Sequence, residues 1–500
     1  MKTTGALLDA WLHRGEPGVV GRPALATRAA TGWAELSYSE LDRTSRRVAV
    51  WLAGQGVGVG ERVAIVGAPG VEWVTALFGV WRRGAVAVPL DTMLGAGELR
   101  SVLQRARPAA VIGTAQAGEI SGSPPPVVLA FDRLGTLDDG PDPDVTRNAG
   151  EAALIAWTSG TDGAPKGVVL SLANIAYVVD EGLAAHSPDR DDRWLSVLPL
   201  NHLLELSCGL LPALATGACF AFAATTSPPL VAAAVAERQI TRMTVVPLLL
   251  HALMDTVSLG DGRLTLHCGG APLDPAVARR FWRLGVPVYT GYGLTETAPT
   301  VTMNTPAACR VDSVGRPLTG TEVRISGDGE VLVRSPGVMA GYWDDEALTT
   351  SVVDPDGWLH TGDLGHLDDE GFLYLTGRTK SQIVLASGKK VQPEEVERAL
   401  AAGSLLAEAC VVGWTPPTPV GGRALGEQVC AVIVAAPSLV ARCSEPRTLT
   451  RAVEDEVARL TAGLAAFKRP SVVRVVTGEL PRTAKRSVRR SEVVRLLTRN

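Results

Sequence analysis

The chain has 500 residues and a formal net charge of only −4, with 46% hydrophobic and 20% charged residues. This length exceeds what one hydrophobic core usually organises, so we expect two or more domains. The near-neutral charge balance argues against partners held by a global field, such as nucleic acid or an anionic membrane.

The cysteines and the apolar segments bound the location of the protein. The seven cysteines are scattered, odd in number and contain no Cys-x-x-Cys pair, which favours reduced thiols in a cytoplasmic protein. The N-terminus lacks the apolar stretch of a signal peptide. Pro212, Gly217 and residues 227–229 interrupt the uncharged segment 206–236, leaving pieces shorter than the roughly 20 residues of a spanning helix. We expect buried α/β elements there and no membrane span.

The first clear elements form a strand–helix–strand unit. Residues 62–66 form an apolar run that predicts a strand, and residues 71–81 carry apolar side chains on one helical face. Residues 85–89 predict the next strand, which gives a right-handed parallel crossover. Because these strands are continuously apolar, we expect a sheet covered on both faces.

The remaining chain predicts three further textures. Loops are expected at 121–126 and 135–150, a second βα series from 153 to about 299, short strands and turns from 315 to about 377, and α+β structure from 381 with helices at 393–402 and 448–464. The predicted fold is therefore α/β, with a large N-terminal domain of two βα subdomains and a β-rich subdomain (1–380) and a small mobile α+β domain (381–500).

A phosphate loop is the first chemical signal. An apolar strand at 153–158 runs into a segment of hydroxyls, glycines and one lysine that ends at Gly167. Glycines let backbone N–H groups approach phosphate oxygens, and Lys166 supplies a positive charge. A Walker loop would open a helix with Gly-Lys-Ser/Thr, whereas here Pro165 precedes the lysine. The alternative for this loop is a glycine-rich surface turn.

Further motifs follow this loop in a fixed order. They are Leu198-Pro199-Leu200-Asn201-His202, Gly269-Gly270-Ala271-Pro272, Gly291-Tyr292-Gly293-Leu294-Thr295-Glu296-Thr297, Gly357-Trp358-Leu359-His360-Thr361-Gly362-Asp363, Gly377-Arg378-Thr379-Lys380, Ser387-Gly388-Lys389-Lys390 and Pro393-Glu394-Glu395. In these motifs the chain resembles, over essentially its whole length, the acyl- and aryl-CoA synthetases of the adenylate-forming superfamily. A fainter resemblance is to the CoA ligases of platensimycin-type diterpenoid pathways.

The resemblance implies a nucleotide site for ATP, AMP or an acyl-adenylate. Tyr292 would stack on adenine, Thr295 would bond the α-phosphate, and Glu296 would hold Mg²⁺, which favours carboxylate oxygen. The implied nucleotide-binding set is Thr158, Ser159, Gly160, Thr161, Gly163, Lys166, Gly270, Ala271, Pro272, Tyr292, Gly293, Thr295, Asp363 (ribose hydroxyls) and Arg378. Taken alone, each carboxylate would usually be solvated surface and the tyrosine core, so the ordered set carries this inference.

The resemblance also implies an acyl site, a coenzyme A tunnel and a hinge. His202 would border the acyl group and shift between half-reactions, although a lone histidine more often packs in a core. The implied acyl-binding residues are His202, Val246, Leu249, Gly269 and Gly291, with Val245, Leu203 and Leu204 adjacent. Those implied for coenzyme A are Ser387, Gly388, Lys389 and Lys390, and the hinge is Lys380 with Ser381, where relatives often carry Asp. Hinge residues need only tolerate new dihedral angles.

The family's last motif is altered in this chain. Relatives end with a pattern like Leu-Pro-Arg-Thr-x-x-Gly-Lys-x-x-Arg, whose lysine bridges the substrate carboxylate and the α-phosphate. Aligned without gaps between Pro481 and Arg490, this chain places Ser487 at the lysine position. Lys485 lies two residues away, or roughly 6–7 Å along a strand. Losing one preorganised charge contact typically costs about 3–4 kcal/mol, or 10²–10³ in rate.

We therefore predict weak or absent adenylation and competent transfer of a preformed acyl-adenylate to coenzyme A, with a separate enzyme supplying the adenylate. The alternatives are a complete two-step ligase in which Lys485 serves, an enzyme that loads a carrier protein, or a non-catalytic adenylate-binding protein. The nearby basic residues would contact coenzyme A phosphates or form a solvated face: Arg482, Arg486, Arg489, Arg490 and Arg495. An amino-acid activator would keep an Asp near His202 to bind the amine. Between Arg193 and Glu205 there is none, so we expect a bulky apolar acid, fatty, aryl or terpenoid.

Overall fold

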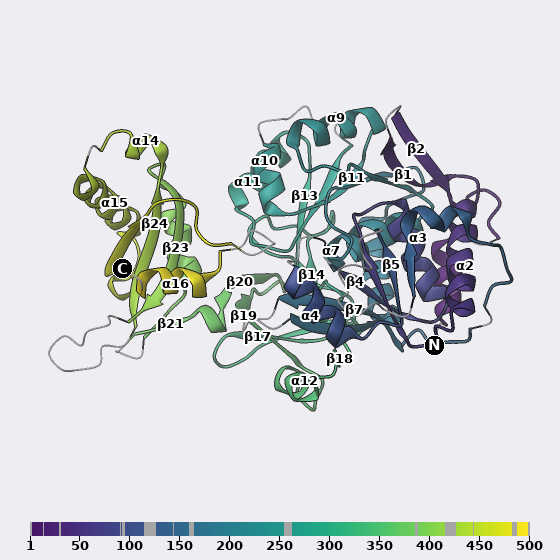
Figure 1. Cartoon of the computed structure of the whole chain (residues 1–500). Coiled ribbons are helices and arrows are strands. Elements are labelled where there is room, and N and C mark those ends of the chain that lie inside the picture. The colour runs from purple at the N-terminus through teal and green to yellow at the C-terminus, as the bar shows by residue number, and fades with distance from the viewer. Residues whose placement is uncertain are drawn as a thin grey trace. The chain divides into compact units, whose positions relative to one another are not determined.

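A computed structural model describes residues 3–13, 15–29, 32–90, 92, 96–114, 127–143, 145–159, 165–254, 263–385, 389–415, 427–443, 445–482 and 488–498. It divides into two compact units. The first comprises Met1–Arg324, Leu332–Thr361 and Leu367–Tyr374, and the second comprises Ile325–Val331, Gly362–His366 and Leu375–Asn500. The α/β class predicted from the sequence is confirmed (Figure 1).

A seven-stranded sheet in the first unit contains the predicted strand–helix–strand unit. Strand β3 (Arg62–Val66), helix α3 (Val71–Arg82) and strand β4 (Val86–Leu90) follow one another, and the two strands pair in parallel. Nearly every residue of both strands is buried, as predicted for a covered sheet. The order is β18-β8-β7-β4-β3-β5-β6, with β5 (Ala110–Gly113), β6 (Val128–Ala130), β7 (Ala152–Ser159), β8 (Pro165–Ser171) and β18 (Gly341–Tyr342).

A nine-stranded sheet carries the second βα series. Its order is β15-β14-β13-β12-β11-β9-β10-β1-β2. The strands are β1 (Pro23–Ala29), β2 (Gly32–Ser37), β9 (Arg193–Ser196), β10 (Cys219–Phe222), β11 (Arg242–Val245), β12 (Thr265–Cys268), β13 (Val288–Tyr292), β14 (Thr302–Met303) and β15 (Arg316–Pro317). Strands β9 to β13 are parallel to one another, so their carboxyl ends lie at one end of the sheet, where open α/β sheets bind ligands.

Different helices cover the two faces of this sheet. Helices α9 (Pro228–Arg238), α10 (Pro247–Leu253) and α11 (Pro275–Arg283) pack on the face formed by Leu195, Met243 and Leu266 (Figure 1). On the other face lie α6 (Leu172–His186), the π-helix η2 (Leu206–Leu210) and α8 (Leu211–Ala215). The uncharged segment 206–236 is thus divided among η2, α8, β10 and α9. Among the described residues, no helix has the length and apolarity to cross a bilayer.

The other helices of the first unit are α1 (Thr4–Trp11), α2 (Tyr38–Gly54), α4 (Ala96–Ala106), η1 (Phe131–Thr136), α7 (Leu203–Glu205), η3 (Thr295–Thr297) and α12 (Glu346–Val352). A four-stranded sheet of order β16-β17-β19-β20 lies after residue 315, as the β-rich texture predicts. Its strands are β16 (Glu322–Ile325), β17 (Glu330–Arg334), β19 (Leu359–Leu367) and β20 (Leu373–Arg378). The division between the two units passes along them.

The second unit contains a three-stranded sheet with helices on both faces. Strands β23 (Leu406–Trp414), β24 (Gln428–Ala435) and β25 (Val472–Val476) pack one face against α13 (Pro393–Leu400) and α15 (Pro446–Thr461). The opposite face packs on α16 (Arg490–Thr498) and Leu480. The two predicted helices are confirmed: α13 starts at 393 as predicted and ends two residues early, and α15 starts two residues and ends three residues earlier than predicted. Pro446 starts α15 early because proline suits the first helical turn. The remaining elements are η4 (Thr379–Ser381), β21 (Ile383–Val384), β22 (Lys390–Val391), α14 (Pro437–Val440) and η6 (Ala466–Lys468).

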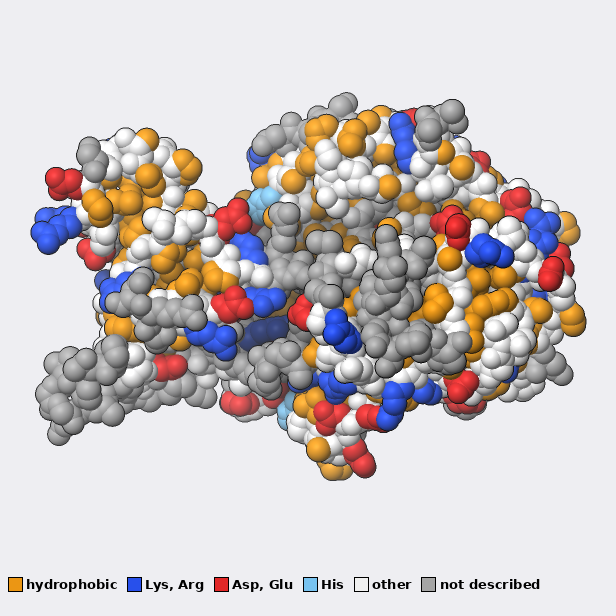
Figure 2. Space-filling model, viewed as in Figure 1, with side chains coloured by type: hydrophobic (Ala, Val, Ile, Leu, Met, Phe, Trp, Pro, Cys, Tyr) orange, Lys and Arg blue, Asp and Glu red, His pale blue; other side chains and the backbone are white. Residues whose placement is uncertain are grey.

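Surface charge and thiols agree with the composition. Acidic and basic side chains are mixed over the face shown in Figure 2, as a net charge of −4 implies. All seven cysteines are free, and Cys268, Cys410 and Cys430 are buried.

The contact between α2 and α3 predicts a stability difference between two helical glycines. A Cβ at Gly79 would lie 2.5 Å from the Val48 side chain and 2.9 Å from the Ser45 carbonyl oxygen, whereas one at Gly182 in α6 would meet nothing within 4 Å. Gly79→Ala should lower the free energy of unfolding by roughly 1–3 kcal/mol. The matched variant Gly182→Ala should raise it by up to about 1 kcal/mol. Urea unfolding measures both, and equal shifts of one sign would contradict the tight contact.

Candidate active site

Three predicted acyl-site residues lie together at the carboxyl edge of the nine-stranded sheet. Val245 pairs with Cys268, and Cys268 pairs with Thr290. Val246, Gly269 and Gly291 each follow one of these paired residues, so the three lie side by side. The Gly269 amide donates to the Val245 carbonyl over 3.2 Å, which continues the pairing.

Leu204 covers this glycine edge. A Cβ at Gly269 would lie 3.1 Å from Leu204 Cδ1, and one at Gly270 would lie 3.7 Å from both Leu204 Cδ2 and Val246 Cγ1. His202 is the residue before α7, so the Leu198–His202 motif leads directly to this contact. The structure brings Leu204, Val246 and Gly269 into one apolar wall. Leu249 is instead buried in the core beneath α9, α10 and α11, together with Val245.

The nucleotide motif forms a tight turn between β13 and β14. A Cβ at Gly293 would lie 1.8 Å from the Pro299 carbonyl oxygen, so only glycine fits there. The hydroxyl of the buried Thr297 accepts a hydrogen bond from the Leu294 amide and donates one to the Leu294 carbonyl, each over 3.0 Å. These contacts stabilise the turn that contains Thr295 and Glu296.

Glu296 and Lys166 meet at the same tyrosine. The Tyr342 hydroxyl donates to Glu296 Oε1 over 2.8 Å, and Lys166 Nζ lies 5.7 Å from the centre of the Tyr342 ring. Burial and the Glu296 carboxylate raise the pKa of Tyr342 well above its usual value, so its proton is retained. The Met339 amide donates to the Glu296 carbonyl over 2.8 Å. The predicted phosphate-loop cation and the predicted metal carboxylate therefore belong to one constellation, the Lys166–Tyr342–Glu296 cluster.

The phosphate loop joins two antiparallel strands. Thr158 on β7 pairs with Lys166 on β8, and Trp343 donates its amide to the Gly167 carbonyl over 2.7 Å. The segment is thus flanked by two paired strands, whereas a Walker loop leads from a strand into a helix, in agreement with the exclusion of that motif. Gly160, Thr161 and Gly163 lie outside the described residues, as does the side chain of Ser159.

In the second unit, Asp363 and Arg378 form an ion pair. Asp363 is buried on β19, and its Oδ1 accepts from Arg378 Nε over 2.7 Å. A Cβ at Gly377 would lie 2.4 Å from Gln392 Oε1, so this glycine permits close contact just before Arg378. The predicted ribose-binding carboxylate and its arginine neighbour are thus paired.

The predicted coenzyme A and hinge residues are partly described. The Leu385 amide donates to the Lys389 carbonyl over 2.9 Å, and Lys389 Nζ lies 4.5 Å from the centre of the Phe467 ring. Ser381 ends the short 3-10 helix η4. Ser387 and Gly388 lie outside the described residues, as do the side chains of Lys380 and Lys390.

The altered C-terminal motif has fixed ends. Arg482 and Val488 form an antiparallel bridge, and the Arg489 amide donates to the Pro481 carbonyl over 2.8 Å. Arg490 binds Glu397 over 2.6 Å and Glu394 over 3.2 Å. Lys485, Arg486 and Ser487 lie outside the described residues. The other basic residues here have partners: Arg482 binds Glu408, Arg489 binds Glu492, and Arg495 also takes part in an interaction.

Below the apolar wall, the same sheet face becomes polar. His267 and Tyr289 precede Gly269 and Gly291 by two residues, which places them on the same face. The His186 ring meets His267 edge-on at 4.5 Å between ring centres. Burial lowers the pKa of His186 to about 4 and that of His267 well below its usual value, so both rings are neutral.

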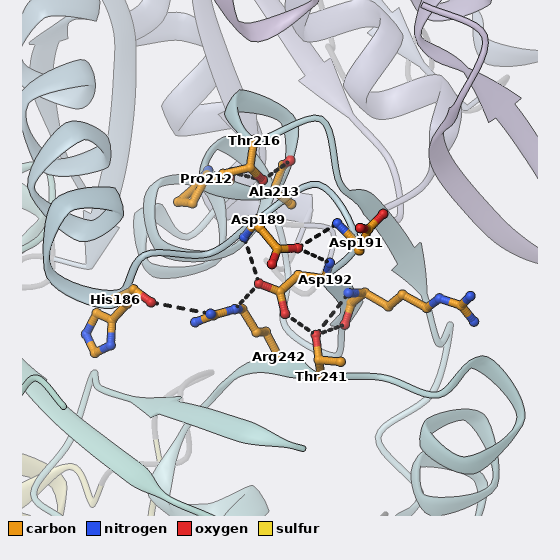
Figure 3. A network of polar contacts seen from close by, with 10 residues as sticks. His186, Asp189, Asp191, Asp192, Pro212, Ala213, Thr216, Thr241 and Arg242 are labelled. Carbon is orange, nitrogen blue, oxygen red and sulfur yellow. Dashed lines mark hydrogen bonds and ion pairs between the residues drawn. The ribbon is translucent and has the colours of Figure 1, made fainter. Parts of the chain in front are cut away.

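A polar network fixes the position of His186 (Figure 3). Arg242 donates to the His186 carbonyl over 3.3 Å and to Asp192 Oδ2 over 2.7 Å, and Thr241 donates to Asp192 Oδ1 over 2.6 Å. These bonds hold the end of α6 against the starts of β9 and β11, so the imidazole pair is a rigid part of the sheet face.

Sequence reasoning missed Tyr342, His267 and the buried Glu205. The Gly341-Tyr342-Trp343 run was a usable signal, since two adjacent aromatic residues are uncommon in a turn-rich region. His267 could have been placed by its spacing of two from Gly269. Glu205 offers no local signal, because one acidic residue in an apolar helix is usually solvated.

Family comparisons agree with this geometry. A model of the AMP-binding enzyme family matches residues 17–343, and a model of the AMP-binding enzyme C-terminal domain matches residues 380–499. The chain belongs to the AMP-binding enzyme family. A feruloyl-CoA synthase of Amycolatopsis sp is 32% identical over 94% of this chain and 96% of its own length. A long-chain-fatty-acid–CoA ligase of Mycobacterium bovis is 33% identical over 77% of this chain and 76% of its own length.

The o-succinylbenzoate CoA synthetase of Bacillus subtilis, solved with its acyl-adenylate intermediate, is 26% identical over 97% of each chain, with a TM-score of 0.83. These matches confirm the resemblance to acyl-CoA ligases of the adenylate-forming superfamily. This AMP-binding enzyme is accordingly an acid–thiol ligase.

The hydroxyl of Tyr342 provides a test of the Lys166–Tyr342–Glu296 cluster. Tyr342→Phe removes the hydrogen bond that orients Glu296, so the Kd for Mg·ATP should rise about tenfold, the value of one charge-assisted bond. Isothermal titration calorimetry measures it. The matched control is Tyr177→Phe, whose hydroxyl donates to the Thr319 carbonyl over 2.7 Å and lies outside the cluster. Equal Kd values for both variants would show that Tyr342 does not support nucleotide binding.

Proposed function

We propose that this enzyme transfers a hydrophobic acyl group from acyl-AMP to coenzyme A and is weak or inactive in forming the adenylate. In the proposed step the thiol attacks the carbonyl of the mixed anhydride, a thioester forms and AMP leaves. The single observation that carries the proposal is Ser487 at the position of the family's adenylation lysine. The proposed nucleotide and acyl residues of the first unit support the half-reaction that forms the thioester.

The anchors of the altered motif support its ungapped alignment. Arg490 is held by two carboxylates of α13, and Pro481 is bonded to Arg489. A compensating gap would have to lie within residues 483–487, between the bridged Arg482 and Val488. A shift of two residues moves a side chain roughly 6–7 Å, whereas catalytic groups tolerate about 1 Å.

The domain arrangement in the proposal follows the family resemblance. Residues 1–380 would hold the adenylate and the acyl group, and residues 381–500 would rotate about Lys380 and Ser381 between half-reactions. The short helix η4 at this junction supports the hinge, since hinges are a few element-terminal residues. Because the lysine acts only in the adenylating orientation, its loss would leave thioester formation intact. A separate adenylating enzyme would then supply the acyl-AMP in the cytoplasm, as part of secondary metabolism.

The proposed substrate is a bulky apolar acid, fatty, aryl or terpenoid. The wall of Leu204, Val246 and Gly269 supports an apolar acyl group. Relatives support the aryl and fatty classes, because they include a feruloyl-CoA synthase and a long-chain-fatty-acid–CoA ligase. Their names also favour coenzyme A over a carrier protein as the acceptor. The second candidate is a complete two-step ligase in which Lys485 acts.

Mg²⁺ fits the residues of the proposed nucleotide site. Within the described ranges, no three His, Cys, Asp or Glu side chains gather to hold a metal. Mg²⁺ does not require such a group, because it commonly binds one or two carboxylates, waters and substrate phosphates. Glu296, oriented by Tyr342, would supply the carboxylate. A Bacillus subtilis relative of 26% identity was solved with ATP and a magnesium ion.

Pyrophosphate exchange tests the division between half-reactions. A panel of acids should give slow exchange with the unmodified chain, and Ser487→Lys should raise the rate roughly 10²–10³-fold because it restores a charge at the transition state. Synthetic adenylates of the same acids should yield thioester with coenzyme A at similar rates for both proteins.

Lys485→Ala is the matched control. It should leave both rates unchanged if Lys485 has no catalytic role. Vigorous exchange by the unmodified chain that Lys485→Ala abolishes would establish the two-step ligase instead. A preformed adenylate that remains intact with enzyme and coenzyme A would refute the thioester-forming function.

A further inference from the structure

Glu205 is a fully buried carboxyl group beside the proposed acyl site. Its exposed fraction is 0%, and neither carboxyl oxygen completes a hydrogen bond with any residue in the described ranges. An unpartnered buried polar group costs free energy. A carboxyl group kept in such a place therefore calls for a functional explanation.

The surroundings of Glu205 confine it against β9 and β11. A Cβ at Gly209 would lie 3.3 Å from Glu205 Oε2 and 3.2 Å from Thr244 Oγ1, so glycine at 209 leaves just enough space for both groups. Ser196 and the backbone of Val197 and Leu198 are the polar groups that face the carboxyl and interact with it weakly. Val197 and Leu198 are the residues at which β9 leads into the His202 motif.

Glu205 therefore contacts both ends of one loop. Its amide donates to the His202 carbonyl over 3.1 Å, and the His202 amide donates to the Pro199 carbonyl over 3.2 Å. Its side chain faces the backbone where the same loop begins. The π-helix η2 starts at the next residue, and such turns are common at functional sites.

We propose that Glu205 is a positioning residue whose buried carboxyl group supports the 197–202 loop and so sets the position of His202 for thioester formation. This inference rests on the proposed function, since His202 borders the acyl group in that proposal. Glu205 itself touches no reacting atom in the proposal and acts through the loop.

The protonation state of Glu205 gives this role a measurable signature. Burial raises its pKa to about 8, although Ser196 and the two backbone groups oppose the rise. The titratable group beside it is Cys208, whose pKa burial raises to about 11, so it remains neutral. Within the described residues, no charged side chain acts on Glu205. The carboxyl is thus uncharged below pH 8, and above that pH it must ionise in an apolar site, which favours opening of the loop.

The experiment compares thioester formation from a synthetic acyl-adenylate between pH 7 and pH 9. Glu205→Gln keeps the shape without the titration, so its kcat should lie within about threefold of the parent at pH 7. The ratio of parent to variant rates should then fall about tenfold by pH 9, as the protonated fraction falls around a pKa of 8. This ratio cancels the ionisation of the coenzyme A thiol. Glu205→Leu should lower kcat at least tenfold with little change in KM for coenzyme A.

Glu237→Gln and Glu237→Leu are the matched controls, because Glu237 lies on the surface at α9 and pairs with Arg28. Their rate ratios should not change with pH. A flat ratio for Glu205→Gln, with an active parent, would overturn the positioning role and leave the proposed function standing. If the parent forms no thioester, the proposed function fails, and hydrogen exchange of residues 197–202 decides the Glu205 role. Glu205→Leu should then accelerate exchange there at pH 7, and unchanged exchange would refute it.

Discussion

A hydrogen bond from Tyr342 to Glu296 connects the two large sheets of the first unit. Tyr342 belongs to the edge strand of the seven-stranded sheet, where it pairs with Val168 on the lysine-bearing strand β8. Glu296 belongs to the turn that follows β13 in the nine-stranded sheet. The bond therefore links the two sheets at the proposed nucleotide site. Because Tyr342 keeps its proton, it serves as a hydrogen-bond donor to Glu296, and Lys166 lies over its ring.

The apolar wall depends on glycines, which carry no side chain, as well as on the side chains of Leu204 and Val246. Gly269 and Gly270 bring their backbone against Leu204, and Gly293 admits the Pro299 carbonyl oxygen. Because these glycines carry no Cβ, neighbouring segments of the chain can approach the strand ends closely. One layer further along the sheet, the neutral imidazoles of His186 and His267 replace aliphatic residues. This sheet face is therefore apolar at the wall and polar at the neighbouring layer, where Arg242 bonds to Asp192 and to the His186 carbonyl.

Local pattern was sufficient to predict the elements and insufficient to predict the contacts between them. The β3–α3–β4 unit follows from apolar runs and helical spacing within 30 residues, and its parallel pairing follows from crossover handedness. Motif order placed Glu296 and Lys166 in one site. Tyr342 was not predicted because its partners are far away in sequence: Glu296 is 46 residues away, and Lys166 is further still. A short stretch of sequence cannot reveal contacts between residues so far apart. Glu205 was not predicted for another reason. What distinguishes it is complete burial of its carboxyl group, which composition does not reveal.

The two half-reactions make different demands on the two units, which is why a local change can separate them. The Lys166–Tyr342–Glu296 cluster and the glycines Gly269 and Gly270 lie in the first unit. These residues are proposed to hold the adenylate, which both half-reactions need. The family's lysine serves adenylation alone, from a segment whose ends are fixed by Arg490 and by the Arg482–Val488 bridge. Replacing that one charge removes stabilisation from a single transition state and leaves the anchors unaltered. A chain with every motif of the first unit and a serine at 487 therefore fits the proposed thioester-forming function, because the residues it retains are those proposed for the second half-reaction.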